Sequence, residues 1–193
     1  TNLSSGKMGF AIARAAREAG SQVVLVAGPV ALATPRGVRR VDVRSALQMQ
    51  AAVQAEVNQA DVFVATAAVA DWRPALASDE KIKKDGSGKT PVLNFTENPD
   101  ILAGVAASDR ARGGQLFCVG FAAESHDLLS NAQAKRVRKG VPLLAGNIGP
   151  ATFGQDDNAL LLIDEQGALE LPHAPKLTLA RQLIEQIALR LAR

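Results

Sequence analysis

Residues 4–29 join a helical pattern to a buried strand and read Ser4-Ser5-Gly6-Lys7-Met8-Gly9-Phe10-Ala11-Ile12-Ala13-Arg14-Ala15-Ala16-Arg17-Glu18-Ala19-Gly20-Ser21-Gln22-Val23-Val24-Leu25-Val26-Ala27-Gly28-Pro29. Met8, Ile12 and Ala15 recur at the spacing of one helix face. After Gln22, residues 23–27 are continuously apolar, as expected for a strand that is covered on both faces. A helix followed by a buried strand predicts an α/β layer architecture.

The same alternation continues along the chain. The pattern predicts strands at 38–43, 61–68, 92–96, 116–121 and 141–145, and helices at 45–58, from 98–100 onward, and at 128–139. Residues 159–163 and 168–171 flank a turn sequence and predict a hairpin, which a helix at 177–193 follows. That last helix places on one face Ala180, Leu183, Ile184, Ile187 and Leu191. The polar, glycine-bearing segment 77–90 is typical of a mobile loop.

Helix ends can also be predicted. A serine at position 4 or 5 is a suitable N-cap for the first helix, Gly20 a suitable C-terminal residue, and Ser45 a suitable N-cap for the second. The 193 residues indicate one domain. We therefore expect residues 1–193 to form a Rossmann-like α/β domain. Its open, mostly parallel sheet carries helices on both faces and ends in a β-hairpin plus helix. Such sheets usually open with a strand, and this chain opens at a helix. We therefore expect either that the first strand is missing or that the sheet is built from one strand fewer than usual.

The composition excludes several classes of protein. The net charge of +3 is too small for a nucleic-acid tail, and 4% aromatic residues offer few platforms for base stacking. No apolar run is long enough to span a bilayer. One cysteine and two separated histidines exclude an internal disulfide and a structural zinc site. Cys118, in mid-strand, is expected to be a buried inert thiol, and His126 and His173 surface residues. We expect a cytoplasmic protein with a small anionic ligand and no nucleic-acid or membrane partner.

Candidate ligand-binding residues lie at helix starts and strand ends. Ser4, Ser5, Gly6, Lys7 and Met8 open the first helix, where small residues, hydroxyls and an ammonium suit a phosphate. The alternative is a capped helix with a tight glycine contact. The pattern is not the GxxxxGK[ST] phosphate loop, because Gly6 directly precedes Lys7 and has no upstream partner glycine.

Two further groups have a functional and a plain interpretation. Small residues after the strand at 61–68 leave room for a flat ligand, and Asp71 can accept from an amine or hold a metal through water, or simply cap a turn. The lysines in 81–84 can close over a triphosphate, or form a solvated loop. Lys135 and Lys139 share one helix face and can grip the same anion, with Arg136 and Arg138 pointing elsewhere.

Taken together, the motifs resemble bacterial phosphopantothenoylcysteine synthetase, usually the C-terminal half of the bifunctional coenzyme A biosynthesis protein. The resemblance covers essentially the whole chain and rests on Asn2-Leu3-Ser4-Ser5-Gly6-Lys7-Met8-Gly9, Ala67-Ala68-Val69-Ala70-Asp71-Trp72-Arg73, Lys81-Ile82-Lys83-Lys84, Asn98-Pro99-Asp100-Ile101, Gly120-Phe121-Ala122-Ala123-Glu124 and the basic residues 135–139. The family's first strand and its flavin-dependent decarboxylase half, which binds FMN, are absent from this chain. Leu3 follows Asn2 at a position where a polar residue is also seen in relatives.

The resemblance implies a ligase that joins 4′-phosphopantothenate to L-cysteine, using CTP and Mg²⁺ through an acyl-cytidylate. By likeness, Asn2 holds the acyl-cytidylate and Lys81 closes over the phosphates. The resemblance also implies a homodimer. The CTP and phosphate site would comprise Ser4, Ser5, Gly6, Lys7, Met8, Ala67, Asp71, Lys81, Asn98, Pro99, Asp100, Ile101, Phe121, Lys135 and Lys139; the metal ligands are not assigned.

Two other functions remain open. A nicotinamide-dependent reductase is disfavoured because the chain has no GxGxxG before a ribose-binding acid and no tyrosine for a Tyr-x-x-x-Lys acid. A regulatory domain would bind CTP without releasing pyrophosphate when phosphopantothenate is added. Stabilisation by NADPH but not by CTP would favour the reductase.

Overall fold

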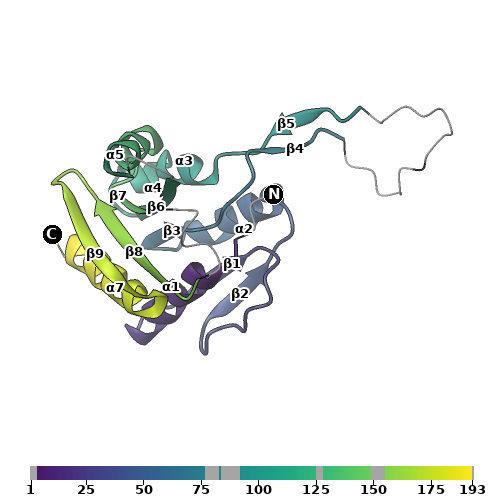
Figure 1. Cartoon of the computed structure of the whole chain (residues 1–193). Helices are drawn as coiled ribbons and strands as arrows, with labels where there is room; N and C mark the ends of the chain where they lie inside the picture. Colours follow the sequence, from purple (N-terminus) through teal and green to yellow (C-terminus); the bar gives the residue numbers. More distant parts are fainter. Residues whose placement is uncertain (1–3, 77–82, 84–91, 125–127, 149–154, 193) are drawn as a thin grey trace.

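The structure is a computed structural model that describes residues 4–76, 83, 92–124, 128–148 and 155–192. Helices and strands alternate along the chain (Figure 1). In chain order they are α1 (Lys7–Glu18), β1 (Val24–Ala27), β2 (Arg39–Asp42), α2 (Ala46–Val57), β3 (Val62–Ala65), β4 (Trp72–Pro74), β5 (Phe95–Glu97), α3 (Ile101–Ala106), α4 (Asp109–Arg112), β6 (Phe117–Glu124), α5 (Leu128–Lys139), β7 (Leu143–Ile148), β8 (Asp157–Ile163), β9 (Ala168–Pro175) and α7 (Lys176–Leu191).

The main sheet has five strands in the order β3-β6-β7-β8-β9. β3, β6 and β7 are parallel, with Val64 opposite Val119 and Gly120 opposite Leu144. β8 and β9 are antiparallel and supply the predicted hairpin. The hairpin strands are longer than the sequence pattern indicated, and the overall α/β class is confirmed.

The sheet is less continuous than expected. β1 and β2 pair in parallel as a separate two-stranded sheet, and β4 and β5 form an antiparallel ribbon. Within the described residues no strand pairs with both β1 and β3, so hydrogen bonding does not link the two parallel groups. The expected single sheet is therefore wrong in detail: its strands fall into three pieces.

Helices cover both faces of the main sheet, as predicted (Figure 1). On one face α1 and α7 pack against the sheet through residues such as Ile12 and Leu183. On the other face α2, α3 and α5 contribute Val53, Val105 and Ala132 to a second cluster. The first cluster contains the fully buried Leu179 and Leu183, and burying each such leucine contributes about 2 kcal/mol.

Several local predictions are confirmed. α5 spans Leu128–Lys139, and the Ser45 hydroxyl caps α2 by accepting from the Gln48 amide at 3.2 Å. Gly20 follows the end of α1 with a φ of 94°, a conformation that glycine adopts at low cost. No helix in the described part of the chain is long and apolar enough to cross a membrane.

Other local predictions are wrong. Neither serine caps α1: Gly6 is the N-cap, in the left-handed region with a φ of 74° and without a side-chain hydrogen bond. Leu191 is half exposed because it lies in the last turn of α7, past the contacts that bury Leu183 and Ile187. The strand expected at 92–96 begins later, as β5. Helix α4 was not predicted, because its four residues give no strong periodic signal.

Candidate active site

The start of α1 lies against the segments that follow β1 and β3. A Cβ added to Gly6 would be 3.1 Å from Val30 Cγ1, and one added to Gly9 would be 2.8 Å from Thr66 Oγ1. The distance at Gly9 is too short for a Cβ and the distance at Gly6 is tight, so these two glycines let the first turn of α1 approach both segments. The positive dipole end of α1 therefore lies where α/β proteins bind anions.

Arg40 supports this arrangement from β2. Its guanidinium donates to the backbone oxygens of Leu32 at 2.7 Å and Val30 at 3.2 Å, and lies 5.2 Å from the Phe10 ring centroid. The carboxylate of Asp42 accepts a third hydrogen bond at 2.7 Å. Arg40 thus ties the segment after β1 to α1. Sequence reasoning missed this residue because the partners that it ties together, Leu32, Val30 and Phe10, lie eight or more positions away.

The predicted phosphate-binding residues occupy different environments. Ser4 is exposed, whereas Ser5 is half-buried and its hydroxyl is 3.5 Å from the Lys7 amide. Met8 packs against the α1 and α7 core, so its side chain is structural and only its backbone amide is suited to an anion. The Lys7 ammonium contacts the Asp156 carboxylate at 2.7 Å.

Asn98 joins the segment directly before β4 to the end of β5, at the base of the β4–β5 ribbon. Its side-chain amide donates to the Ala70 oxygen at 2.8 Å, and its backbone amide donates to the Asp71 oxygen at 2.7 Å. Arg73 donates to the Asn98 side-chain oxygen at 3.3 Å and to the Glu97 backbone oxygen. Ala67 and the Asp71 side chain remain exposed. Asp71 and Asn98 are therefore brought together, with Arg73 as a supporting residue that the prediction missed, while the part of Ala67 in this site stays a prediction.

Asp100 connects α3 to α5. One carboxylate oxygen caps α3 by accepting from the Ala103 amide at 3.0 Å, and the other contacts the Lys139 ammonium. Partial burial acts to raise the pKa of Asp100, but the hydrogen bonds from Lys139 and Ala103 and the nearby positive charges outweigh it and lower the pKa. Asp100 therefore stays ionised and holds Lys139 in place.

Among the basic residues of α5, Arg136 points away from Lys139, as predicted. Lys135 is half-buried one turn before Lys139, whereas Arg136 donates to the Val141 oxygen at 3.4 Å, beyond the end of its own helix. The basic last turn of α5 also matches the negative end of the helix dipole. A joint grip of Lys135 and Lys139 on one anion stays a prediction.

Two residues predicted to contact the nucleotide, Ile101 and Phe121, lie partly in the protein interior. Ile101 packs with the α2, α3 and α5 cluster, and Phe121 with the α1 and α7 cluster, on the other face of the sheet. Pro99 is half-buried beside the α3 cap. Their direct contact with a nucleotide stays a prediction.

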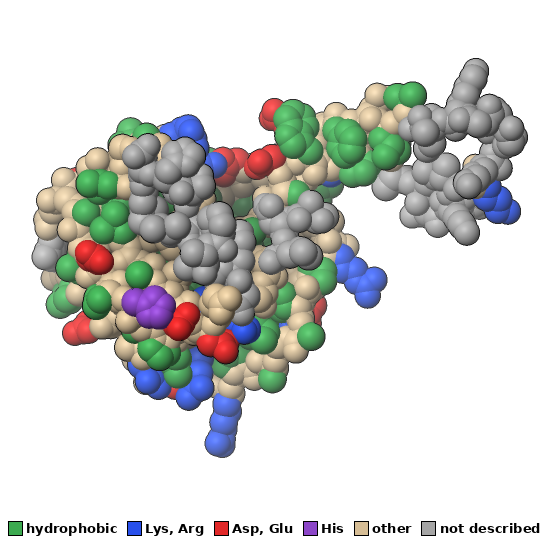
Figure 2. Space-filling model, in the orientation of Figure 1, with side chains coloured by type: hydrophobic (Ala, Val, Ile, Leu, Met, Phe, Trp, Pro, Cys, Tyr) green, Lys and Arg blue, Asp and Glu red, His purple; other side chains and the backbone are tan. Residues whose placement is uncertain are grey.

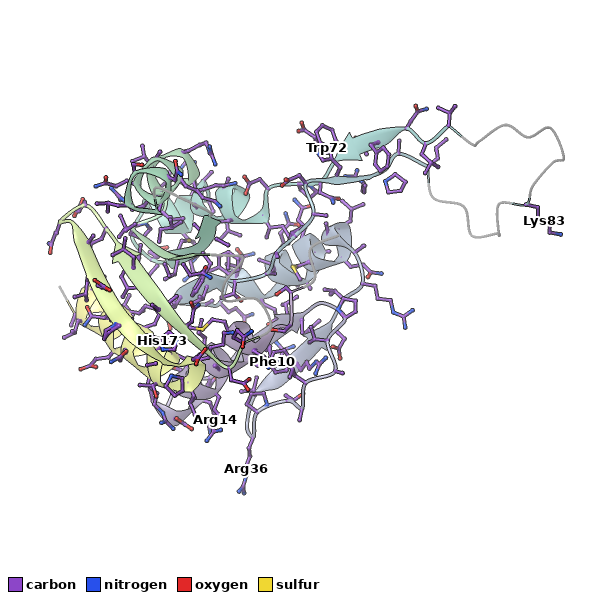
Figure 3. The ribbon with its side chains drawn as sticks, in the orientation of Figure 1. Phe10, Arg14, Arg36, Trp72, Lys83 and His173 are labelled. Carbon is purple, nitrogen blue, oxygen red and sulfur yellow. The ribbon has the colours of Figure 1, made fainter. Side chains whose placement is uncertain are left out.

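The two residues predicted to be catalytic, Asn2 and Lys81, lie outside the described residues, as does His126. Of the 81–84 run only Lys83 is described, and it is exposed (Figure 3). Cys118 is buried, which raises the pKa of its thiol to about 11, so it is unsuited to act as a nucleophile. His173 is exposed, as expected, 3.5 Å from Asp157. In the part of the chain described here, no three His, Cys, Asp or Glu side chains gather as metal ligands.

Comparison with known proteins decides the family. Residues 1–191 match the family described as the DNA/pantothenate metabolism flavoprotein C-terminal domain. The chain belongs to this family. The resemblance inferred from the six motifs is confirmed.

Members of the family are similar in both sequence and structure. The chain is 45% identical over 190 residues to the coenzyme A biosynthesis bifunctional protein CoaBC of Vibrio cholerae, covering 97% of this chain and 47% of that protein. The chain thus spans about half the length of this curated relative. The crystal structure of a CoaBC C-terminal domain has a TM-score of 0.82 and 32% identity, covering 99% of this chain and 85% of that one.

A more distant structure shares the fold alone. A Cab2 variant in complex with phosphopantothenate-cysteine has a TM-score of 0.78 and 16% identity, covering 99% of this chain and 79% of that one. The expected fold is thus found in both solved structures, while the roles of individual residues rest on the geometry above.

Proposed function

We propose that this domain joins 4′-phosphopantothenate to L-cysteine with CTP, in coenzyme A biosynthesis. The observation that carries the proposal is the family match over residues 1–191, with 45% identity to a coenzyme A biosynthesis protein. The complex of Cab2 with phosphopantothenate-cysteine supports the product. The start of α1, with Lys7, and the lysines of α5 supply the cations that such anionic substrates need.

The reaction has two steps. The pantothenate carboxylate attacks the α-phosphorus of CTP, which forms the acyl-cytidylate and releases pyrophosphate. The cysteine amine then attacks the acyl carbon and expels CMP. Neither step needs a nucleophile from the protein, in agreement with the buried thiol of Cys118. The chain's contribution is to position the reactants and to stabilise developing negative charge.

We assign each part of CTP to a different segment of the chain. We assign the triphosphate to the start of α1, where Gly6 and Gly9 keep the backbone accessible, and the cytidine to the segment from Ala67 to Asp71 that Asn98 and Arg73 hold in place. Lys139 is kept in position by Asp100. Asn2 and Lys81 complete the site as inferred from the family: Asn2 holds the acyl-cytidylate, and Lys81 closes over the phosphates.

Mg²⁺ fits this site as a companion of the nucleotide. The described residues hold no group of three metal-binding side chains, whereas a triphosphate offers the oxygen ligands that Mg²⁺ prefers. The exposed Asp71 carboxylate is suited to hold such an ion through water. The ion would supply charge neutralisation on the phosphates.

The fused decarboxylase half belongs to the proposal for the full-length protein. CoaBC relatives are described as bifunctional, and this chain matches about half of their length. We therefore expect an FMN-binding decarboxylase on a separate part of that protein, and a cytoplasmic location, where CTP and free cysteine are available.

A homodimer is proposed from the β4–β5 ribbon, which extends away from the rest of the fold (Figure 1). Trp72 is 57% exposed and Phe95 58% exposed, and hydrophobic side chains gather along the ribbon (Figures 2 and 3). An isolated two-stranded ribbon is only marginally stable in water. A second copy related by two-fold symmetry would cover the same residues on both ribbons.

The dimer has a direct test. Replacing Trp72 and Phe95 together by serine should give a monomer in analytical ultracentrifugation, while Leu189→Ser, at a residue 52% exposed on α7, should leave the dimer intact. A wild-type protein that sediments as a monomer, or a double variant that remains dimeric, contradicts this assignment.

The ligase assignment is tested by pyrophosphate release. The protein is incubated with 4′-phosphopantothenate and CTP, ATP or UTP, without cysteine. We expect release with CTP above the other two. Lys81→Gln should slow this step, whereas Asn2→Asp should let the acyl-cytidylate accumulate. Release at the wild-type rate in the Lys81 variant counts against its role, and binding of CTP without any release identifies a regulatory domain.

A further inference from the structure

Helices α1 and α7 run in the same direction and begin side by side. At their starts, Lys7 of α1 and Lys176 of α7 both contact Asp156, and farther along Ala15 and Ala19 of α1 line one shallow cavity with Ile184 and Ala188 of α7. Lys7 and Lys176 are the first residues of the two helices. Two positive helix ends, each followed at once by a lysine, therefore lie at one place.

Lys176 is an unusual lysine because only 7% of it is exposed. Its ammonium donates to the Gln155 backbone oxygen. Burial, followed by the charge of Lys7, lowers the pKa of Lys176, although Asp156 and Asp157 act in the opposite direction. A buried ammonium close to a second lysine is electrostatically costly, and an anion bound between them would relieve that cost.

Asp156 currently supplies negative charge at this position. Its carboxylate accepts from the Lys7 ammonium at 2.7 Å, while its backbone oxygen accepts from the Lys176 amide at 2.9 Å. The hydrogen bond from Lys7 lowers the pKa of Asp156, so the carboxylate is ionised. Its side chain is nevertheless 91% exposed, and such an exposed ion pair contributes little to stability. The carboxylate can leave Lys7 without loss of the backbone contact.

We propose that Lys7 and Lys176 form one phosphate-binding subsite, and that Asp156 is its displaceable counter-ion, which a phosphate group of the ligand replaces on Lys7. The proposal deepens the proposed function and rests on it only for which substrate carries the phosphate. A phosphate dianion binds two ammonium groups more strongly than a carboxylate monoanion does, so Asp156 favours phosphate ligands over carboxylates.

The first test uses inorganic pyrophosphate as the probe, with affinity measured by calorimetry at low salt. Asp156→Asn removes the competing charge from an exposed position, so it should bind pyrophosphate roughly three- to tenfold more tightly than wild type. Glu165→Gln is the matched control, because it removes one exposed charge in the turn beyond the far end of β8 and should leave the affinity unchanged. Unchanged or weaker binding by Asp156→Asn, or no binding by the wild type, overturns the proposal.

The second test removes the buried charge. Lys176→Met keeps the side-chain length and should weaken pyrophosphate binding at least about tenfold, whereas Lys176→Arg should retain most of it. Thermal melting reports whether the methionine variant is folded, and the Asp156 variant carries the test if it is not. A folded Lys176→Met protein with wild-type affinity contradicts the proposal.

These outcomes are separable from the ligase assignment. Pyrophosphate binding needs neither CTP nor phosphopantothenate. If the ligase assay fails while Asp156→Asn still tightens pyrophosphate binding, the subsite stands and the proposed function falls. The reverse result removes the subsite and leaves the ligase assignment in place.

Discussion

Replacing Gly6 by alanine tests how the start of α1 is built. Gly6 has a φ of 74°, where an alanine costs about 1–2 kcal/mol, of which part is offset because alanine restricts the unfolded chain. The new Cβ would also lie 3.1 Å from Val30 Cγ1. Moving the stiff valine adds about 1 kcal/mol. We expect a total loss of about 2 kcal/mol in the free energy of unfolding.

Gly20→Ala is the matched control at the other end of α1. Gly20 has a similar φ of 94°, but an added Cβ would have no atom within 4 Å. This variant should lose only the backbone cost, about 1 kcal/mol. Urea denaturation measures both losses, and calorimetry measures CTP affinity.

The two variants should differ most in ligand binding. Gly6→Ala displaces the first turn of α1 from Val30 and should weaken CTP binding about tenfold or more, whereas Gly20→Ala should bind CTP as the wild type does. Equal CTP affinities in the two variants, or wild-type affinity in Gly6→Ala, would refute the placement of the triphosphate at this helix start.

Three further predictions concern the core, the Asp100 ion pair and the thiol. Leu183→Ala removes a fully buried side chain from the α1 and α7 face and should lower the free energy of unfolding, measured by urea denaturation, by about 3 kcal/mol. Leu189→Ala, on the exposed face of α7, should lower it by less than about 0.5 kcal/mol. Similar losses in the two variants would contradict the packing. The folded-state pKa of Asp100 is lowered, so its ion pair stabilises the fold at pH values above the ordinary pKa of 3.8, and this stabilisation is lost as the pH falls through the lowered pKa. The difference in free energy of unfolding between wild type and Asp100→Asn should therefore shrink in acid. A difference that grows in acid would contradict this expectation. Cys118, with its pKa raised to about 11 by burial, should react with a thiol reagent at pH 8 only after unfolding, and rapid reaction of the native protein would show that the thiol is accessible.

The sequence predicted best the elements whose signals are local. Ser45 caps its helix and α5 has the expected bounds, because a cap and an apolar stripe lie within one short segment. Gly6 was missed as the N-cap because residues 4–8 reveal neither its left-handed conformation nor the close approach of Val30.

Sheet pairing was harder to predict. The apolar runs identified β1, β3 and β6, but which strands pair depends on the whole chain, so the separation of β1 and β2 from the main sheet was missed. The short β4 was also missed. Three residues with an exposed tryptophan give little periodic signal, and β4 is stabilised by pairing with β5 more than twenty residues later.

The candidate site shows the same division. Residue types and motif order identified Lys7, Asn98, Asp100 and Lys139 as candidates. Their present partners could not be predicted: Lys7 meets a carboxylate 149 positions later, and Lys139 meets one 39 positions earlier. Contacts across such separations follow from the packing of the helices and are invisible to local patterns.

Oxygen labelling tests the proposed chemistry most directly. With ¹⁸O in the carboxylate of 4′-phosphopantothenate, attack on the α-phosphorus of CTP makes a labelled oxygen the bridge of the acyl-cytidylate. Attack of the cysteine amine on the acyl carbon then leaves that oxygen on the expelled CMP. Mass spectrometry should find one ¹⁸O in CMP for each phosphopantothenoylcysteine formed, and CMP without label would contradict the acyl-cytidylate route.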